Sequence, residues 1–215
     1  HMVFPLKGFT LKWYDQMIHS SRLHRALMNS VKVGVIASIF STFIALLAAK
    51  AFTKYKVKLR QLSYGAILLP FVIPEIIIAV SLIVLWTGMG LQLGLVPVTI
   101  SHILFCTPFC MLVLISRMEG FDRNLEEAAM DLGENAWGTF WRVTFPLALP
   151  AIVASLLLSF VISFDEFILA FFLSSHDQTL PLYMWGQLRF PKKLPHVLAL
   201  GAVIILATSI IVMLS

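Results

Sequence analysis

The organisation of this chain follows from one stretch, Glu127-Ala128-Ala129-Met130-Asp131-Leu132-Gly133, which is followed after nine residues by Val143-Thr144-Phe145-Pro146. Both pieces lie in a polar segment, 118–146, within a sequence that is 59% hydrophobic. Apolar sequence resumes after Pro146 and Pro150. An acidic short helix with an alanine face, set between two membrane spans, has the form of an element that a soluble partner protein binds.

The composition excludes an ordinary soluble domain. The mean hydropathy is +0.90 and only 13% of residues are charged, whereas soluble domains carry roughly 25% charged residues. The apolar runs are long and continuous, which favours membrane-spanning helices over the alternating strands of a barrel. We therefore predict an all-α, polytopic transmembrane helical bundle. The net charge of +5 lies mostly beside the spans, so it indicates membrane topology and no nucleic-acid partner.

Five apolar stretches are long enough to cross the bilayer: 30–50, 64–87, 97–117, 147–173 and 195–215. They form one membrane domain over 30–215. The preceding segment, 1–29, begins with His1-Met2, which resembles the remainder of a cleaved tag. The rest of this segment mixes aromatic and basic residues, and is expected either to lie on the membrane surface as a helix or to be a solvated linker.

Three of these stretches carry further structural signals. The first span contains small residues at three- and four-residue steps, which predict close helix packing. They are Gly34, Ser38, Thr42, Ala45 and Ala49. Pro70 and Pro74 should kink the second span. His102, Cys106 and Cys110 share one helical face in the third. A single helix cannot enclose a tetrahedral metal ion, so we interpret the cysteines as buried or lipid-facing small side chains and expect no metal site.

The basic residues give a preferred orientation. Five Lys and Arg residues lie between Lys50 and Arg60, beside span ends, where positive charge favours the cytoplasm. We therefore expect loops 51–63 and 118–146 in the cytoplasm, and the N-terminal segment, 88–96 and 174–194 outside.

The polar segment 118–146 contains helix-end signals. Asp122 or Asn124 can cap a helix, and Asn124 with Glu127 resembles a capping box. Glu126 and Glu127 are expected in the first turn, where acidic groups complement the helix dipole. Gly133 suits the left-handed residue that ends a helix.

A second turn is expected after that glycine. Asn135 can cap it, and Trp137, Phe140 and Trp141 give it an apolar side. An ordinary amphipathic surface loop would have much the same composition. Composition alone therefore does not distinguish such a loop from a partner-binding element.

The spacing from Glu127 to Pro146 closely resembles the EAA loop of ATP-binding-cassette (ABC) importer permeases, with Val143 and Phe145 as conservative departures. This resemblance implies a type I ABC importer permease fold and a cytoplasmic coupling helix that docks on the ATPase subunits. The residues that it implies for coupling are Glu126, Glu127, Ala128, Ala129, Asp131, Gly133 and Pro146.

Further segments resemble the spermidine/putrescine-type branch of this family, among them Phe9-Thr10-Leu11-Lys12-Trp13-Tyr14, Pro74-Glu75 and Ser163-Phe164-Asp165-Glu166-Phe167. The branch implies an inner (plasma) membrane location in a bacterial cell, an ABC ATPase dimer, a second permease subunit and a periplasmic solute-binding protein that lands near 174–195. Its members usually have six spans, so we expect the first to be missing here. ATP and Mg belong to the partner ATPase, and no cofactor is expected on this chain.

Three acids lie inside expected spans: Glu75, Asp165 and Glu166. Intramembrane carboxylates are costly and face the bundle interior or a watery cavity. They could attract a cationic solute such as a polyamine, or they could hydrogen-bond the backbone of broken helices. The aromatic residues expected nearest the outer mouth are Trp86, Tyr183 and Trp185, which could contact an amine or lie in the interfacial belt.

The chain lacks the G-x-x-x-x-G-K-[ST] phosphate loop and the H-E-x-x-H zinc motif. Together with this absence, the family resemblance implies a non-catalytic permease subunit of an ATP-driven importer of a small solute, a polyamine or a related amine or amino-acid derivative. The alternative is a self-sufficient secondary transporter or channel that uses Glu75, Asp165 and Glu166 as ion or proton sites.

Overall fold

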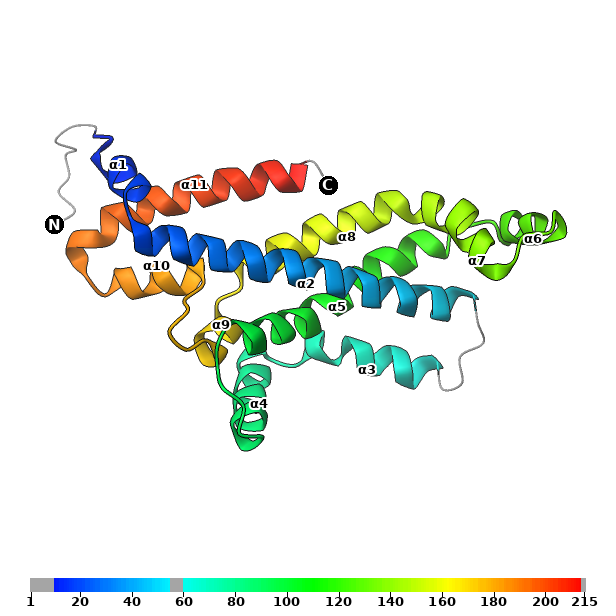
Figure 1. Ribbon diagram of the computed structural model, residues 1–215, viewed down its shortest axis with the longest axis horizontal. Helices are drawn as coiled ribbons and strands as arrows, with labels where there is room; N and C mark the ends of the chain where they lie inside the picture. The colour runs from blue at the N-terminus through cyan, green and yellow to red at the C-terminus, as the bar shows by residue number, and fades with distance from the viewer. Residues whose placement is uncertain (1–9, 55–59, 214–215) are drawn as a thin grey trace.

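The computed structural model describes residues 10–54 and 60–213, and within them it contains helices and no strand (Figure 1). The predicted all-α class is confirmed. His1-Met2, Lys56 and Lys58 lie outside the described residues. The helices are α1 (Lys12–Ile18), α2 (Ser21–Lys54), α3 (Arg60–Val72), α4 (Glu75–Gly88), α5 (Leu95–Met118), α6 (Arg123–Asp131), α7 (Ala136–Thr139), η1 (Phe140–Thr144), α8 (Phe145–Asp165), α9 (Ile168–Leu173), α10 (Leu180–Leu188), η2 (Pro191–Lys193) and α11 (Leu194–Met213).

Four helical segments are long and apolar enough to span a membrane, and a bent pair makes a fifth candidate. The four are Ser21–Thr53, Leu95–Met118, Ala136–Asp165 and Pro191–Ile210; the pair is Gln61–Val72 with Glu75–Gly88. These correspond to the five predicted stretches. The pair turns by 100°, which is much sharper than a kink. Pro74 cannot donate a backbone hydrogen bond, and the chain at Ile73–Pro74 leaves the helical conformation, so α4 starts in a new direction.

The predicted 147–173 stretch is also broken. α8 ends at Asp165, Glu166 has extended backbone angles (φ −69°, ψ 128°), and α9 begins at Ile168. The breaks of the two discontinuous spans lie near each other inside the molecule.

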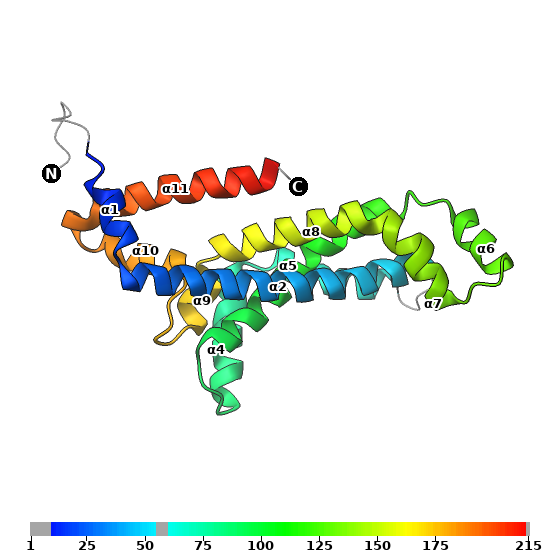
Figure 2. The same cartoon turned by 45° about the horizontal axis from the view of Figure 1, so that its top comes forward.

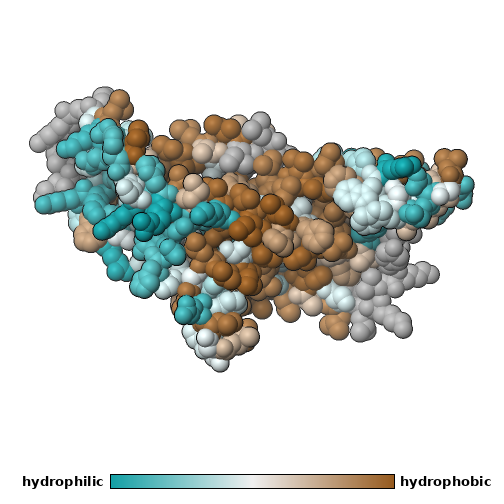
Figure 3. Space-filling model, in the orientation of Figure 1, coloured by the Kyte–Doolittle hydropathy of each residue, from teal (hydrophilic) through white to brown (hydrophobic). Residues whose placement is uncertain are grey.

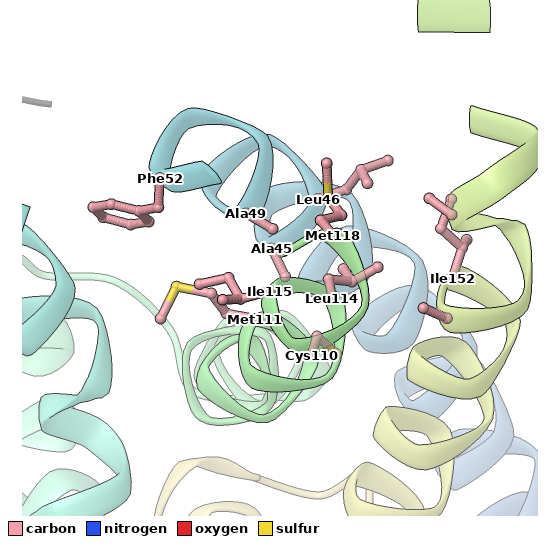
Figure 4. Packing of buried hydrophobic residues seen from close by; sticks show 12 residues of the cluster. Ala45, Leu46, Ala49, Phe52, Cys110, Met111, Leu114, Ile115, Met118 and Ile152 are labelled. Atoms are coloured by element: carbon pink, nitrogen blue, oxygen red, sulfur yellow. The ribbon is translucent and has the colours of Figure 1, made fainter. Parts of the chain in front are cut away.

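The core is formed by α2, α5 and α8, which make the most extensive helix contacts. Figure 4 shows side chains of α2, α5 and α8 packed together, among them Ala45, Ala49, Leu114 and Ile152. The predicted small-residue face of α2 is buried here, and a Cβ on Gly34 would lie 3.0 Å from the Phe160 ring of α8. Small side chains thus allow close helix approach.

The molecule is polar at its ends and apolar in the middle (Figure 3). α6 and α7 lie at one end of the long axis together with the C-terminal end of α2, whereas α1 and α10 lie at the other (Figures 1 and 2). Both views also show α4 projecting from the bundle. The polar segment 118–146 therefore forms most of one end of the molecule.

Candidate functional site

Helix α6 begins at a side-chain cap. The Asp122 carboxylate accepts a hydrogen bond from the backbone N–H of Asn124 at 3.0 Å, so Asp122 is the cap and Asn124 lies inside the helix. The predicted capping box of Asn124 and Glu127 is therefore wrong. Glu126 lies in the first turn as expected, whereas Glu127 starts the next turn because the helix begins at Arg123.

The end of α6 has the predicted left-handed glycine. Gly133 has φ +93°, its N–H donates to the Met130 carbonyl at 2.9 Å, and the Glu134 N–H donates to the Ala129 carbonyl at 3.1 Å. This pair of bonds is a Schellman motif, which satisfies carbonyls that a helix end leaves free. The Asn135 side chain then accepts from the N–H groups of Trp137 and Gly138 and caps α7, as predicted. Helix, turn and second helix are thus fixed locally.

The connection from α7 into α8 is a π-helical turn, η1. The Phe145 N–H donates to the carbonyl of Phe140, five residues back. The widened turn accommodates Pro146, whose ring would clash with the carbonyl four residues before it in an α-helix. The Thr144 hydroxyl donates to the Glu126 carboxylate, and this bond joins α6 directly to the start of the α8 span.

Polar and aromatic contacts hold the rest of the segment in place. Arg142 pairs with Glu134, and the Lys50 ammonium of α2 lies 4.0 Å from the centre of the Phe140 ring. Trp137, Phe140, Trp141 and Phe145 pack ring against ring. The segment is therefore tied to both α2 and α8.

The outer surface of α6 and α7 carries exposed apolar side chains among its polar ones. Leu132 is 88% exposed and Trp137 is 70% exposed, and Leu125 and Met130 are also exposed. Among the residues predicted for coupling, Glu127, Ala128, Asp131, Gly133 and Pro146 are exposed, whereas Glu126 and Ala129 are half-buried. Apolar side chains gathered at a water-accessible end are typical of a protein-binding surface.

A second set of polar groups lies inside the bundle, around Glu166. The Glu166 carboxylate accepts from the backbone N–H groups of Leu169 at 2.9 Å and Ala170 at 3.2 Å, so it caps α9. Its Oε2 also lies 3.1 Å from Nε2 of His102 on α5. Nε2 makes no aligned hydrogen bond with this oxygen, so the two side chains are in close polar contact. Nδ1 of His102 lies 2.7 Å from the Ser163 hydroxyl.

The three predicted intramembrane acids separate into two places. Glu75, the first residue of α4, lies near Glu166. Asp165 points elsewhere and lines a cavity of about 460 Å³ between the end of α8, α10 and α11. Asp165 is the one acidic residue among the residues that line this cavity.

The predicted aromatic residues also separate. Trp185 lines the Asp165 cavity with Phe167, and the Arg189 guanidinium lies 4.2 Å from the Trp185 ring centre. Tyr183 is buried in an apolar cluster with Met17 and Leu180. The indole N–H of Trp86 donates to the backbone carbonyl of Gln92 at the far end of α4.

Two further polar residues, His102 and Ser163, belong to the group around Glu166. The sequence did not predict them there. His102 is only 1% exposed. Cys106 and Cys110, on the same face of α5, are buried, and their sulfur atoms lie 3.7 Å from the carbonyl oxygens of Ser159 and Ser155. The sequence offers one signal for the Glu166 cluster, which is a histidine within an apolar run. A buried histidine needs a polar partner, and here that partner is the Glu166 carboxylate.

These features define a class: a multi-span helical membrane protein with a capped, partner-accessible helical element at one end. The chain belongs to the binding-protein-dependent transport system inner membrane components, whose family model matches residues 41–215. It is therefore a multi-pass inner-membrane permease subunit. Membership of this family does not favour the self-sufficient transporter or channel.

Individual relatives agree with this assignment. The chain is 32% identical over 210 residues to the spermidine/putrescine transport system permease protein PotC of Escherichia coli (strain K12), covering 97% of this chain and 79% of that protein. It is 28% identical over 213 residues to the putrescine transport system permease protein PotI of the same strain, covering 95% and 75%.

Solved structures show the same fold. A bacterial alginate ABC transporter in complex with an alginate pentasaccharide-bound periplasmic protein gives a TM-score of 0.74 at 18% identity, covering 96% of this chain and 81% of the other. An amino acid ABC transporter with histidines gives 0.63 at 15% identity, covering 96% of both chains. The predicted ABC importer permease fold is confirmed.

Proposed function

We propose that this permease subunit couples ATP hydrolysis in a partner ATPase dimer to solute import through its segment 118–146. The carrying observation is that apolar side chains are exposed on and beside α6 and α7, and that the Glu126–Thr144 bond joins α6 to the start of α8. The exposed side chains are those of Leu125, Met130, Leu132 and Trp137. A force applied to α6 reaches the span through a capped, rigid element. ATP and Mg are bound by the partner and not by this chain.

The proposed orientation follows the positive charge near the end of α2. The α6–α7 end faces the cytoplasm, and the outer segment 174–194 receives a periplasmic solute-binding protein. A second permease subunit completes the pathway, of which this chain forms half.

We propose a polyamine, or a related amine, as the solute, because PotC and PotI are named for spermidine and putrescine transport. The cavity beside Asp165 supports this choice. It combines one carboxylate with the aromatic rings of Phe167 and Trp185 in otherwise largely apolar surroundings, and an alkyl amine offers the matching ammonium group and methylene chain. Glu75, Glu166, Trp86 and Tyr183 are proposed as further pathway residues.

The docking proposal is tested by Leu132→Asp in cells that contain the whole transporter. The readouts are co-purification of the ATPase and ATP-dependent uptake. Full burial of a leucine side chain contributes roughly 1.5–3 kcal/mol, and a tenfold change in affinity is about 1.4 kcal/mol, so we expect at least about tenfold weaker ATPase binding. Leu11→Asp is the matched control, since Leu11 is 78% exposed at the opposite end of the molecule. Unchanged binding and uptake in Leu132→Asp would refute the docking surface.

The solute proposal is tested by competition of uptake with putrescine, spermidine and a zwitterionic amino-acid derivative. We expect both amines to compete and Asp165→Asn to raise the KM for spermidine. Asp15→Asn, which removes an exposed carboxylate of α1 outside the outer segment, is the control. If neither amine competes, the solute is not a polyamine, while the ATPase docking result stands on its own.

A further inference from the structure

The two discontinuous spans of this chain are joined at their breaks. α4 begins at Glu75, directly after the 100° bend, and α9 begins just after Glu166. The two short helices pack on each other through Ile78, Ala79 and Leu169. The carboxyl groups of Glu75 and Glu166 lie near each other at the same junction.

His102 of α5 makes polar contacts at this junction. Its two ring nitrogens face two different partners on the other broken span: Nδ1 lies 2.7 Å from Ser163 Oγ, and Nε2 lies 3.1 Å from Glu166 Oε2. The His102 and Glu166 side chains are 1% and 4% exposed. A buried carboxylate without a compensating partner is costly, so the imidazole and the two α9 amides together hold Glu166 in place.

α9 is fixed at both ends. Its first amides donate to Glu166, and the carbonyl of Leu173, its last residue, accepts from the Gly94 N–H at 2.9 Å. Between these ends, Ala170 and Leu173 are buried against Val33 and Val98. The outer segment begins directly after Leu173. The position of α9 therefore determines where that segment starts.

We propose that His102 is a positioning residue for transport, which acts through Glu166 and Ser163 to hold α9 on α5 and α4. α8 runs from the coupling segment to Ser163 and Asp165, so the junction is where its displacement passes to α9 and the outer segment. His102 does not contact solute. It keeps the coupling segment and the outer segment moving together. This inference rests on the proposed coupling function.

Histidine suits this task because its two nitrogens are separated by the rigid ring. One nitrogen can donate while the other accepts, so the ring bridges a carboxylate and a hydroxyl in a fixed geometry. Alanine loses both contacts. Glutamine keeps one donor and one acceptor on a flexible chain, and should restore part of the function.

The test uses the complete transporter in proteoliposomes with spermidine as the solute. We expect His102→Ala to lower maximal uptake about tenfold, because polar contacts with a buried charged group are strong, with the KM within about twofold of the unmodified protein. ATP hydrolysed per spermidine should rise by a similar factor. His102→Gln should recover most of the loss, and His102→Ala should add little in a Glu166→Gln background.

Ser101→Ala is the matched control. Ser101 is a buried neighbour on α5 whose hydroxyl donates to the Val98 carbonyl of its own helix, so we expect no change in the ratio of ATP to solute. Equal losses of ATPase activity and uptake in His102→Ala, or no loss at all, would overturn the proposal, since a purely structural role lowers both together.

A second measurement does not depend on the solute. Amide hydrogen exchange of Leu169 and Ala170 in the purified protein should be about tenfold faster in His102→Ala. If His102→Ala does not fold, Ser163→Ala provides the same readout with one contact removed. Unchanged exchange at these amides refutes the positioning role even if spermidine proves to be the wrong solute; absent uptake by the unmodified transporter, with faster exchange in the variant, refutes only the solute.

Discussion

Gly133 provides the sharpest test of how the coupling segment is built. Its φ of +93° is a conformation that L-residues avoid, and a Cβ at this position would meet no atom within 4 Å. The cost of Gly133→Ala is therefore conformational and not steric. A left-handed L-residue costs roughly 1–2 kcal/mol, which corresponds to a factor of about 5–30 in the population of an open form.

The assay is hydrogen exchange in the detergent-solubilised protein at the two amides that close the end of α6. These are the backbone N–H groups of positions 133 and 134, which donate to the carbonyls of Met130 and Ala129. We expect exchange at both amides to be about 5–30-fold faster in Gly133→Ala. Gly133→Asn should lie between this variant and the unmodified protein, since asparagine tolerates this region of backbone angles better than alanine.

Gly120→Ala is the matched control in the same segment. Its φ is not positive, and its added Cβ would lie 3.6 Å from the Arg117 carbonyl oxygen, an ordinary contact. We predict backbone strain for alanine at position 133 and none at position 120. Equal exchange in Gly133→Ala and the unmodified protein, or equal acceleration in Gly120→Ala, would refute this prediction.

Two substitutions and one labelling experiment test the caps and the packing. Asn135→Ala removes the acceptor for two backbone N–H groups of α7 and should destabilise that turn by about 1 kcal/mol, seen as faster exchange at Trp137 and Gly138; unchanged exchange would contradict the cap. Gly34→Leu should lower the stability in an SDS titration by about 1–3 kcal/mol, because Phe160 lies 3.0 Å from the position of a Cβ, and Phe160→Ala should recover part of the loss. Cys110, buried and uncrosslinked, should react with a maleimide only after denaturation; fast labelling of the folded protein would show that the α2–α5–α8 core is open.

Local chemistry explains what could be predicted from the sequence. Asp122, Gly133 and Asn135 each act on backbone groups within a few residues, so their identities indicate approximately where α6 begins, where it ends and where α7 begins. The small residues of α2 predict close packing for the same reason, since they need only a neighbouring helix. The incorrect capping box arose because Asp122 and Asn124 both qualify as caps, and only the three-dimensional path of the chain selects one.

Long-range contacts explain what could not be predicted. His102 and Ser163 are separated by 61 residues, and nothing in the sequence of α5 indicates that partner. The three intramembrane acids looked equivalent, yet Glu166 caps a helix and Asp165 lines a cavity. Pro74 predicts a break but not a 100° bend, because the direction of α4 depends on its packing against α9.

The central claim is that the exposed α6 surface meets an ATPase in the cytoplasm. The most direct measurement is photo-crosslinking in intact cells from a benzophenone amino acid at position 132, with the adduct identified by mass spectrometry. A covalent product with a subunit that carries an ATP-binding phosphate loop is the predicted result. A product with a periplasmic protein, or labelling of position 132 by a membrane-impermeant reagent added outside the cell, would contradict it.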